Sequence, residues 1–310
     1  MESHQRSTAA PKFSGNPTED NVKDLNYDFK QICDRNRDGS FATEADRRNI
    51  LDLVANQLLE MGFRHMRASS LKTKHIDALV ARWRAQPLST GTFKNRMAVL
   101  RWLAGKLGKN GIVKESNAAY DIGKRCHVAT VSKARTLDAS QLGKVLDPFV
   151  AMSLKLQVAF GLRREESIKI VPAWADRGDH LLLKASWTKG GREREIPINT
   201  AQQRALLADA RGLAAGKSLV GPAHASYRVW LAHFKHACAS AGIHKVHGHR
   251  HLYAQERYRE LTGWACPACG GPSGAQLTLE QKAIDRKMRL QISRELGHGR
   301  AQITTVYLGR

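Results

Sequence analysis

Residues 247–254 spell HGHRHLYA, in which three histidines and an arginine open a segment expected to be helical. His247 and Arg250 are three positions apart, so both side chains fall on one face where a helix begins. The first helical turn also presents backbone N–H groups and the positive end of the helix dipole, which favour a phosphate. A metal site is the weaker interpretation, because no carboxylate is close by and the spacing is not the H-E-x-x-H of zinc proteases. We therefore expect a phosphate site without a metal ion here.

Two motifs earlier in the sequence carry groups that could bind or protonate a phosphodiester. GLRREE places Arg163 three positions before Glu166, and a planar guanidinium can hold two phosphate oxygens at once. WTKGGR carries Lys189 beside two glycines, which favour the tight turn of a β-hairpin. An ammonium group on such a turn can give a proton to a leaving-group oxygen. Alone, each motif is also explained by a surface ion pair or a solvated turn lysine.

The remaining motif lies close to residue 310. ELGH ends in His298, and Tyr307 follows it by nine positions. A single tyrosine is ordinarily a packing residue. His298 and Tyr307 therefore indicate a function only in combination with the other three motifs.

In combination, the four motifs resemble the signature of the tyrosine recombinase (phage integrase) family. That signature is an arginine in a G-L-R-x-x-E context, a hairpin lysine, an H-x-x-R box, an L-G-H box and a tyrosine nine residues later. All occur here, in that order. One departure is His249, which stands where the family usually has leucine and is expected to alter the packing beneath the site. The resemblance covers about residues 138–310 directly.

The resemblance implies a reaction at a DNA phosphodiester. Tyr307 would attack the scissile phosphate, form a 3′-phosphotyrosine and free a 5′-hydroxyl. Arg163 and Arg250 would hold the non-bridging oxygens, whose charge grows in the transition state. Because the phosphotyrosine keeps the energy of the broken bond, another 5′-hydroxyl can religate the strand without ATP. We expect no cofactor and no metal ion.

The resemblance assigns supporting roles to four further residues. Lys189 would protonate the departing 5′ oxygen, and His247 would assist removal of the phenolic proton, since an unperturbed tyrosine has a pKa of about 10. His298 would donate a hydrogen bond to the phosphate. Glu166 would orient the neighbouring basic groups.

The family resemblance also implies partners. We expect a site-specific recombinase that acts on double-stranded attachment sites as a homotetramer, for integration or excision of a mobile element, with possible help from DNA-bending or directionality proteins. Two alternatives remain open. One is a type IB topoisomerase-like enzyme that nicks and religates a single duplex with the same residues, and the other is a catalytically silent DNA-binding protein of the same fold.

The composition agrees with a nucleic-acid partner. The chain has 310 residues with 50 Lys and Arg against 28 Asp and Glu, a formal net charge of +22, and neutralising phosphates with such cations releases counterions. No run approaches the ~20 apolar residues of a membrane helix, and the first residues contain no signal-peptide core. We expect a cytoplasmic protein without membrane contact. Five scattered cysteines do not suggest a disulfide framework.

Hydrophobic periodicity predicts a mainly α fold with a small antiparallel β-sheet (α+β). A flexible N-terminal arm over 1–22 precedes a helical domain over 23–125, which looks like the SAM-like core-binding (DNA-binding) domain of the family. A linker over 126–137 leads to the catalytic integrase domain over 138–310. The expected helices are a segment capped by Thr43 and stopped by Gly62, then 74–85, 90–107, 140–159, 164–170, 200–213, 227–241, 250–261, 279–296 and 301–307, with strands over 180–185 and 194–198.

A basic helix face in the first domain is the expected DNA-backbone contact. Its cations have few carboxylates between them, which favours phosphate contact over a plain solvated surface. They are Lys72, Lys74, Arg82, Arg84, Lys94, Arg96, Arg101 and Lys106.

An unusual segment separates the last two motifs. Cys266 and Cys269 have the spacing of a zinc knuckle, but a structural zinc needs four ligands, so His244 or Cys238 would have to join them. The other interpretation is a Gly- and Pro-rich surface loop with two free thiols. The sequence leaves both open.

Overall fold

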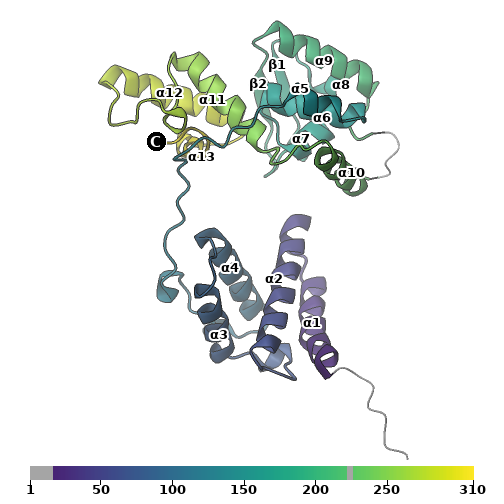
Figure 1. Cartoon of the computed structure of the whole chain (residues 1–310), viewed down its shortest axis with the longest axis vertical. Helices are drawn as coiled ribbons and strands as arrows, with labels where there is room; N and C mark the ends of the chain where they lie inside the picture. The colour runs from purple at the N-terminus through teal and green to yellow at the C-terminus, as the bar shows by residue number, and fades with distance from the viewer. Residues whose placement is uncertain (1–16, 222–225) are drawn as a thin grey trace, which may run out of the picture. The chain divides into compact units, whose positions relative to one another are not determined.

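The computed structural model describes residues 17–221 and 226–310, which form two compact units divided after Cys126 (Figure 1). Each unit has its own buried core. The first unit is helical, and the second combines helices with one antiparallel hairpin. The predicted α+β class is thereby confirmed.

The first unit is built from four α-helices around an apolar core. Ser40 caps the second helix by accepting a hydrogen bond from the backbone N of Thr43 at 3.2 Å. The cap is therefore Ser40, and Thr43, which we predicted as the cap, lies one turn inside. Gly62 follows the end of the helix with φ +87°, as its predicted role as a stop requires. The elements are α1 (Pro17–Arg35), α2 (Phe41–Glu60), α3 (Thr73–Arg84) and α4 (Thr90–Lys106), with 3₁₀ turns η1 (Ala68–Ser70), η2 (Asn110–Ile112) and η3 (Ala118–Tyr120).

Helix α1 begins at Pro17, inside the segment predicted as a flexible arm. Leu25 and Phe29 on this helix are buried in the core of the first unit. The helix is therefore a structural part of this unit. The rest of the predicted arm, residues 1–16, lies outside the described residues.

The second unit opens with a helix pair where one long helix was predicted over 140–159. Asp147 caps the second of the pair, accepting from the backbone N of Phe149 at 2.8 Å, and Pro148 occupies its first position. Proline at this position ends any preceding helix and starts a new one, which explains the break. The elements of this region are α5 (Ala139–Gly143), α6 (Pro148–Phe160), α7 (Arg164–Lys169) and α8 (Pro172–Ala175).

The predicted hairpin is present and antiparallel. Strand β1 (His180–Leu183) pairs with β2 (Arg194–Pro197), so that Leu183 lies opposite Arg194. A 3₁₀ turn, η4 (Ala185–Trp187), follows β1. The two glycines at the tip have φ of +92° and +64°, the conformation for which glycine was predicted. Alternation along β2 buries Arg194 and Ile196 together.

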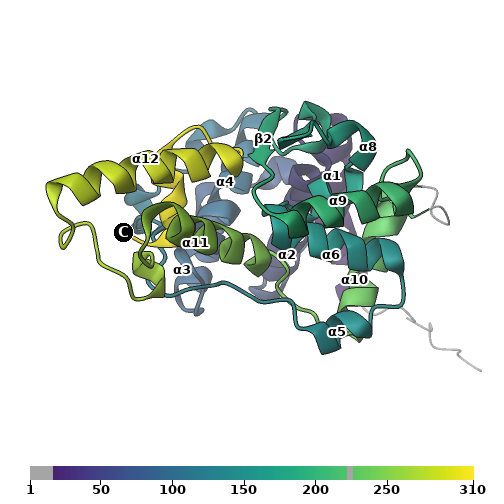
Figure 2. The same ribbon diagram turned by 90° about the horizontal axis from the view of Figure 1, so that it is seen from above.

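Helices complete the second unit. Helices α11 and α12 lie side by side, as both Figures 1 and 2 show. The predicted capping box before α12 is confirmed, since the Thr278 hydroxyl accepts from the backbone N of Gln281 at 3.2 Å. The elements are α9 (Ala201–Ala214), α10 (Tyr227–Ser240), α11 (Gly248–Thr262), η5 (Pro267–Cys269), α12 (Leu279–Glu295), η6 (Ala301–Thr304) and α13 (Thr305–Leu308).

Residues 126–137, which we predicted as a linker, contain neither helix nor strand. Their backbone is nevertheless bound to the second unit. Ala129 N donates to the carbonyl of Thr305 at 2.9 Å, and Arg135 N donates to the carbonyl of Gly248 at 3.1 Å. His249 Nδ1 lies 2.9 Å from the carbonyl of Arg135. The segment therefore contacts both the start of α11 and helix α13.

The main core of the second unit gathers α6, the hairpin, α11, α12 and α13 around fully buried side chains such as Phe160 and Ile292, and it includes Tyr307 and Leu308. A second cluster packs α10 against α6 through Trp230 and Phe234. Within residues 17–221 and 226–310, no helix has the length and apolar character needed to cross a bilayer.

Helix α11 packs closely against the turn after α6, and a substitution at Gly161 tests this packing. Gly161 has φ +57°, and a Cβ placed there would come within 2.5 Å of Tyr253 Cδ1. We expect Gly161→Ala to destabilise the second unit by about 2–4 kcal/mol, since backbone strain and overpacking add. Urea unfolding followed by circular dichroism measures the change.

The matched control for this prediction is Gly216→Ala. Gly216 also has positive φ, +79°, but no atom lies within 4 Å of the added Cβ. We expect it to lose only about 1–2 kcal/mol, the cost of the left-handed backbone alone. Equal losses in the two variants would contradict the close packing of Tyr253 on Gly161.

Candidate active site

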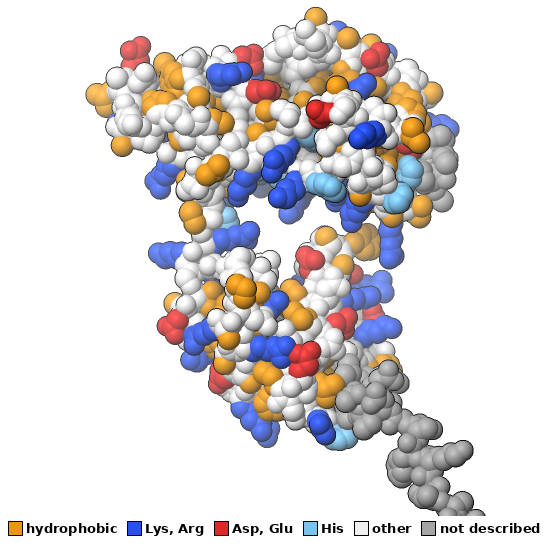
Figure 3. Space-filling model, viewed as in Figure 1, with side chains coloured by type: hydrophobic (Ala, Val, Ile, Leu, Met, Phe, Trp, Pro, Cys, Tyr) orange, Lys and Arg blue, Asp and Glu red, His pale blue; other side chains and the backbone are white. Residues whose placement is uncertain are grey.

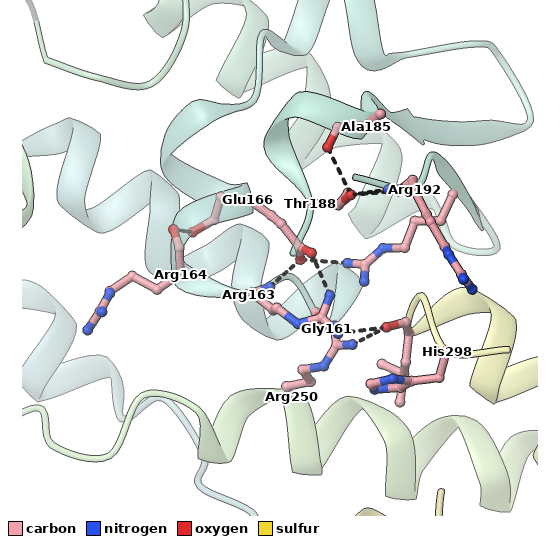
Figure 4. Close-up of polar contacts among 12 residues, drawn as sticks. Gly161, Arg163, Arg164, Glu166, Ala185, Thr188, Arg192, Arg250 and His298 are labelled. Atoms are coloured by element: carbon pink, nitrogen blue, oxygen red, sulfur yellow. Dashed lines mark hydrogen bonds and ion pairs between the residues drawn. The ribbon is translucent and has the colours of Figure 1, made fainter. Parts of the chain in front are cut away.

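The carbonyl oxygen of Leu296 joins two arginines that are far apart in the sequence. Arg163 Nη2 donates to it at 3.3 Å, and Arg250 Nη2 donates to it as well. Leu296 is fully buried at the end of α12. The two predicted phosphate-binding arginines therefore lie together, with their guanidinium groups fixed by one backbone atom (Figure 4).

Arg163 sits at the N-cap of α7, where Glu166 accepts hydrogen bonds from it twice. Glu166 Oε2 lies 2.6 Å from the backbone N of Arg163, and Glu166 Oε1 lies 2.7 Å from Arg163 Nη1. Glu166 thus supplies one half of a capping box, whereas the guanidinium of Arg163 has no acceptor atom and does not cap the helix. The next residue, Arg164, points away from this cluster (Figure 4). Of the two adjacent arginines in GLRREE, Arg163 is thus the one that faces the site, as predicted.

Arg250 is almost completely buried in the first turn of α11, at 1% exposure. Its Nη1 donates to the carbonyl of Gly161 at 2.5 Å, and its Nη2 donates to Leu296. These two bonds fix the plane of the guanidinium group. Its Nε then donates to the phenolic oxygen of Tyr307 at 3.2 Å.

Tyr307 therefore lies in the arginine cluster of its own chain. Its phenolic oxygen is 3.5 Å from His298 Nε2, and its side chain is buried. The backbone around it is held in place as well, because Gln255 Nε2 donates to the carbonyl of Tyr307 at 2.9 Å. Helix α13 presents the phenol at the cluster in a fixed orientation.

Gly297 makes the turn between Leu296 and His298 possible. Its φ is +68°, and a Cβ there would come within 2.9 Å of Arg194 Nη1. Only glycine combines this backbone with such a close approach. The L-G-H motif thus has a direct physical meaning: a buried carbonyl for the arginines, a turn without a side chain, and a histidine directed at the phenol.

Lys189 and His247 line a small cavity next to Arg163. The cavity has a volume of about 280 Å³, and Glu166 and Trp187 also border it. Lys189 is exposed at the hairpin tip. Thr188 closes that tip, because its hydroxyl donates to the carbonyl of Arg192 at 2.6 Å (Figure 4). The structure thereby gathers all six predicted catalytic side chains in one region of the second unit.

The histidines of the site are neutral near pH 7. Burial, followed by the charges of Arg250 and Arg163, lowers the pKa of His298 from the ordinary 6.5 to about 4. His247 is largely exposed as a residue, but partial desolvation of its ring and the same two arginines lower its pKa as well. A neutral imidazole can accept a proton, so His247 is in the form that a general base requires.

Sequence reasoning missed two buried residues of the cluster. Arg194 on β2 donates from Nη2 to Glu166 Oε2 at 2.6 Å. The ring of His251 lies 4.8 Å from that of Tyr307, measured between centroids, and burial together with His247 lowers the pKa of His251 to about 4. A signal for Arg194 existed, since the period of two in the predicted strand places it on the same face as Ile196.

The predicted basic face of the first unit divides into two groups. All four of its arginines are already engaged within the unit: Arg82 pairs with Glu60, and Arg84 with Asp121 at 3.1 Å. The other engaged members are Arg96, which lies over Trp83, Arg101, which donates to Asn117, and Lys106, which pairs with Asp38.

Three lysines of that face have no such engagement. The side chains of Lys72, Lys74 and Lys94 form no ion pair with any residue that the structure describes. Lys72 and Lys74 are also well exposed. In the second unit, Lys, Arg and His side chains gather along one edge of that unit, which is its lower edge as drawn in Figure 3.

The two cysteines of the predicted zinc alternative lie around η5. Cys269 Sγ donates to Gln255 Oε1 at 3.0 Å, and Cys266 is buried in the core. Cys238 lies in a different core cluster. Across the described part of the chain, no three His, Cys, Asp or Glu side chains are grouped as ligands for a metal ion. The geometry favours two free thiols.

Comparisons with known proteins agree with this geometry. A family model described as phage integrase, N-terminal, matches residues 22–113, and one described as integrase matches residues 123–256. No curated protein sequence matches the chain significantly.

Three solved structures illustrate the shared fold. The XerH site-specific recombinase bound to palindromic difH substrate has a TM-score of 0.55 at 14% identity, covering 92% of this chain and 81% of its own. The Tn1549 transposon integrase in complex with transposon right-end DNA has 0.53 at 14%, covering 94% and 95%. A lambda integrase tetramer bound to a Holliday junction has 0.51 at 14%, covering 87% and 72%.

The lowered pKa of His298 predicts a pH dependence of stability for the DNA-free protein. Between pH 6.5 and about 4 the unfolded chain binds a proton at this histidine that the folded chain does not. Protonation therefore favours unfolding, and stability falls as the pH drops through this window. We expect His298→Gln to show a smaller fall in the free energy of unfolding than the unchanged protein, measured by urea titrations across the window.

The exposed His244 provides the control. His244→Gln is expected to retain the full pH dependence of the unchanged protein. If His298→Gln retained it too, His298 would not be held neutral by the cluster.

Proposed function

Because the chain belongs to the tyrosine recombinase (phage integrase) family, we propose that it cleaves and rejoins double-stranded DNA at specific sites through a 3′-phosphotyrosine on Tyr307. The observation that carries this proposal is the hydrogen bond of 3.2 Å between Arg250 Nε and the Tyr307 hydroxyl. This contact between two side chains of one chain supports Tyr307 as the nucleophile and Arg250 as a phosphate-binding group. It also supports delivery of Tyr307 in cis.

The first step would be attack of the Tyr307 oxygen on the scissile phosphorus. A bond from phosphorus to the phenolic oxygen forms, and the bond from phosphorus to the 5′ oxygen breaks. Arg250 would support this attack in two ways: its Nε would stabilise charge on the phenolic oxygen, and the N–H groups not used by Gly161 and Leu296 would donate to the phosphate. Charge that develops on the non-bridging oxygens is stabilised by donors fixed in advance, which need no reorganisation.

Two protons move during this step: one leaves the attacking phenol, and another is donated to the departing 5′ oxygen. The phenolic proton would pass to neutral His247, whose lowered pKa keeps the base form available. Lys189, which lines the same cavity as His247, would give a proton to the departing 5′ oxygen. His298, near the phenolic oxygen, would hydrogen-bond to a phosphate oxygen. All of these groups belong to the protein, so the mechanism uses no cofactor.

Religation would reverse the same chemistry. A 5′-hydroxyl attacks the phosphotyrosine, and the phenolic oxygen of Tyr307 leaves. Exchange of strands between two duplexes follows when the attacking hydroxyl belongs to the partner duplex, and no ATP is needed because the ester retains the bond energy.

The proposed partners follow from the same reaction. Recombination of two duplexes requires four cleavages, so we propose a homotetramer on two attachment sites, with one Tyr307 from each protomer. The lambda integrase tetramer on a Holliday junction provides a precedent in a protein of the same fold. Integration or excision of a mobile element in the cytoplasm is the proposed biological setting, with DNA-bending or directionality proteins as possible accessories.

Tyr307→Phe tests the nucleophile. We expect the variant to form no covalent adduct on a nicked suicide substrate carrying the attachment site, a loss of at least about 1,000-fold, because the attacking oxygen is gone. DNA affinity should change less than about threefold, since the phenol is buried. A denaturing gel measures the adduct, and a mobility shift measures binding.

The control for this variant is Tyr258→Phe. Tyr258 is also buried, but its hydroxyl donates to Asp285 on α12 at 2.5 Å, so adduct formation should persist. Adduct formation by Tyr307→Phe would refute the assignment. A protein that binds the site without any adduct would be a silent binder, and one that nicks and religates but never exchanges strands would be topoisomerase-like.

The three lysines of the first unit that form no ion pair among the described residues are expected to contact DNA phosphates in a salt-dependent way. Replacing Lys72, Lys74 and Lys94 together by Ala should weaken binding to all DNA sequences. It should also lower the slope of log affinity against log salt by up to about 2.7, or roughly 0.9 for each lost phosphate contact. Fluorescence anisotropy at several salt concentrations measures the slope.

Arg82→Ala with Arg84→Ala provides the comparison. These guanidinium groups are already paired within the unit, so the double variant should change the slope less. An unchanged slope in the triple lysine variant would exclude this surface as the DNA contact.

A further inference from the structure

Arg194 is a buried cation that no part of the proposed mechanism uses. Its side chain is 3% exposed, and it lies beneath Gly297, where an added Cβ would meet Nη1 at 2.9 Å. Only its Nη2 is bonded, to Glu166 Oε2 at 2.6 Å, while Nε and Nη1 have no hydrogen-bond partner among the described residues. Burying a guanidinium that is hydrogen-bonded through only one nitrogen costs free energy of folding. The presence of Arg194 here therefore requires an explanation.

The explanation for the buried charge of Arg194 begins with its partner, Glu166. It is fully buried and accepts from Arg163 N and Nη1 as well as from Arg194. Burial alone would raise the pKa of this carboxyl, but the guanidinium groups of Arg194, Arg163 and Arg250 outweigh burial and lower it. Glu166 is therefore an anion inside the pocket that has to attract another anion, the phosphate.

Arg194 borders a cavity of about 840 Å³ together with the carboxylates of Glu193, Glu195 and Glu295. None of these three forms an ion pair with Arg194 among the described residues, and Glu193 and Glu195 are exposed. The third carboxylate, that of Glu295, is buried. Its oxygens are bonded to the Tyr253 hydroxyl at 2.9 Å and to Arg257 at 3.2 Å. Arg194 and Glu166 thus form the closest pair of opposite charges at the centre of the cluster.

We propose that Arg194 is a positioning residue whose charge offsets that of Glu166, so that Glu166 can orient Arg163 without neutralising it. Three buried or half-buried arginines surround one carboxylate. With Arg194 matched to Glu166, Arg163 and Arg250 both keep their charge for the phosphate. The inference rests on the proposed function, because it concerns how this site binds and activates DNA.

The physical argument is competition for Arg163. An unmatched carboxylate within hydrogen-bond distance of Arg163 attracts it with an energy that a low-dielectric surrounding enlarges. The phosphate would then have to compete with the carboxylate of Glu166 for Arg163 in the transition state, where the arginine is needed most. A purely structural role for Arg194 would instead be to fill the space beneath Gly297, and its charge would be irrelevant.

The test is a charge-compensation cycle on the full-length protein. We compare single-turnover cleavage of the nicked suicide substrate by Arg194→Met, by Glu166→Gln and by the double variant. Arg194→Met should lower the cleavage rate constant at saturating protein at least about tenfold, with DNA affinity changed much less, because most phosphate contacts lie elsewhere. Gln at position 166 keeps a carbonyl oxygen for Arg163 but carries no charge.

The decisive result is the direction of change on adding the second substitution. If charge matching is the role, Arg194→Met with Glu166→Gln should cleave several-fold faster than Arg194→Met alone. A double variant that is as slow as the single one, or slower, overturns the proposal. Arg194→Lys, which keeps the charge, should likewise be faster than Arg194→Met, and equal rates would count against the proposal.

Two controls keep the result interpretable. Thermal midpoints show which variants fold, and Arg194→Gln replaces Arg194→Met in the same cycle if the latter does not. Arg204→Met removes an ion pair with Asp176 in the same unit and should leave the cleavage rate unchanged. Absence of an adduct with the unchanged protein would refute the proposed function itself, whereas an active protein without charge compensation would refute only the role of Arg194.

Discussion

The carbonyl oxygen of Leu296 holds the guanidinium groups of Arg163 and Arg250 in one place, and most of the site depends on that constraint. Two like charges repel, so they stay together only if acceptors with fixed positions hold them. Backbone carbonyls at the ends of α6 and α12 do this for Arg250. Because these acceptors belong to packed helices, the core of the second unit supplies the preorganisation that the proposed reaction needs.

The same cluster influences the protonation of His298, His251 and Glu166. Its positive charge and low exposure keep His298 and His251 neutral, and it keeps Glu166 ionised in a fully buried position. Such an arrangement costs stability in the free protein, since buried charges and unpaired N–H groups are unfavourable. A bound phosphate would supply the missing counter-charge, so the strain is consistent with a site built for an anion rather than for structural support.

The sequence predicted most of the helices, the hairpin and the six side chains that the structure brings together, because these leave local signals. Ser40 and Asp147 were missed as caps, and the break before Pro148 was overlooked, since helical periodicity continues across it. Arg194 was missed for a different reason. Its partner Glu166 is 28 positions earlier in the chain. The period of two in the predicted strand places Arg194 on the face of Ile196, but no local pattern shows which carboxylate it pairs with. The ion pairs that engage Arg82 and Lys106 are equally non-local.

The position of Tyr307 depends on contacts that extend beyond the arginine cluster. Its own carbonyl is held by Gln255 on α11, and the carbonyl of Thr305 accepts from Ala129 in the segment 126–137. That segment also bonds to Gly248 and contacts His249 at the start of α11, the helix that carries Arg250. The chain entering the second unit therefore touches both the helix that carries Tyr307 and the helix that carries Arg250. Residues outside the arginine cluster thus help to hold these two side chains in position.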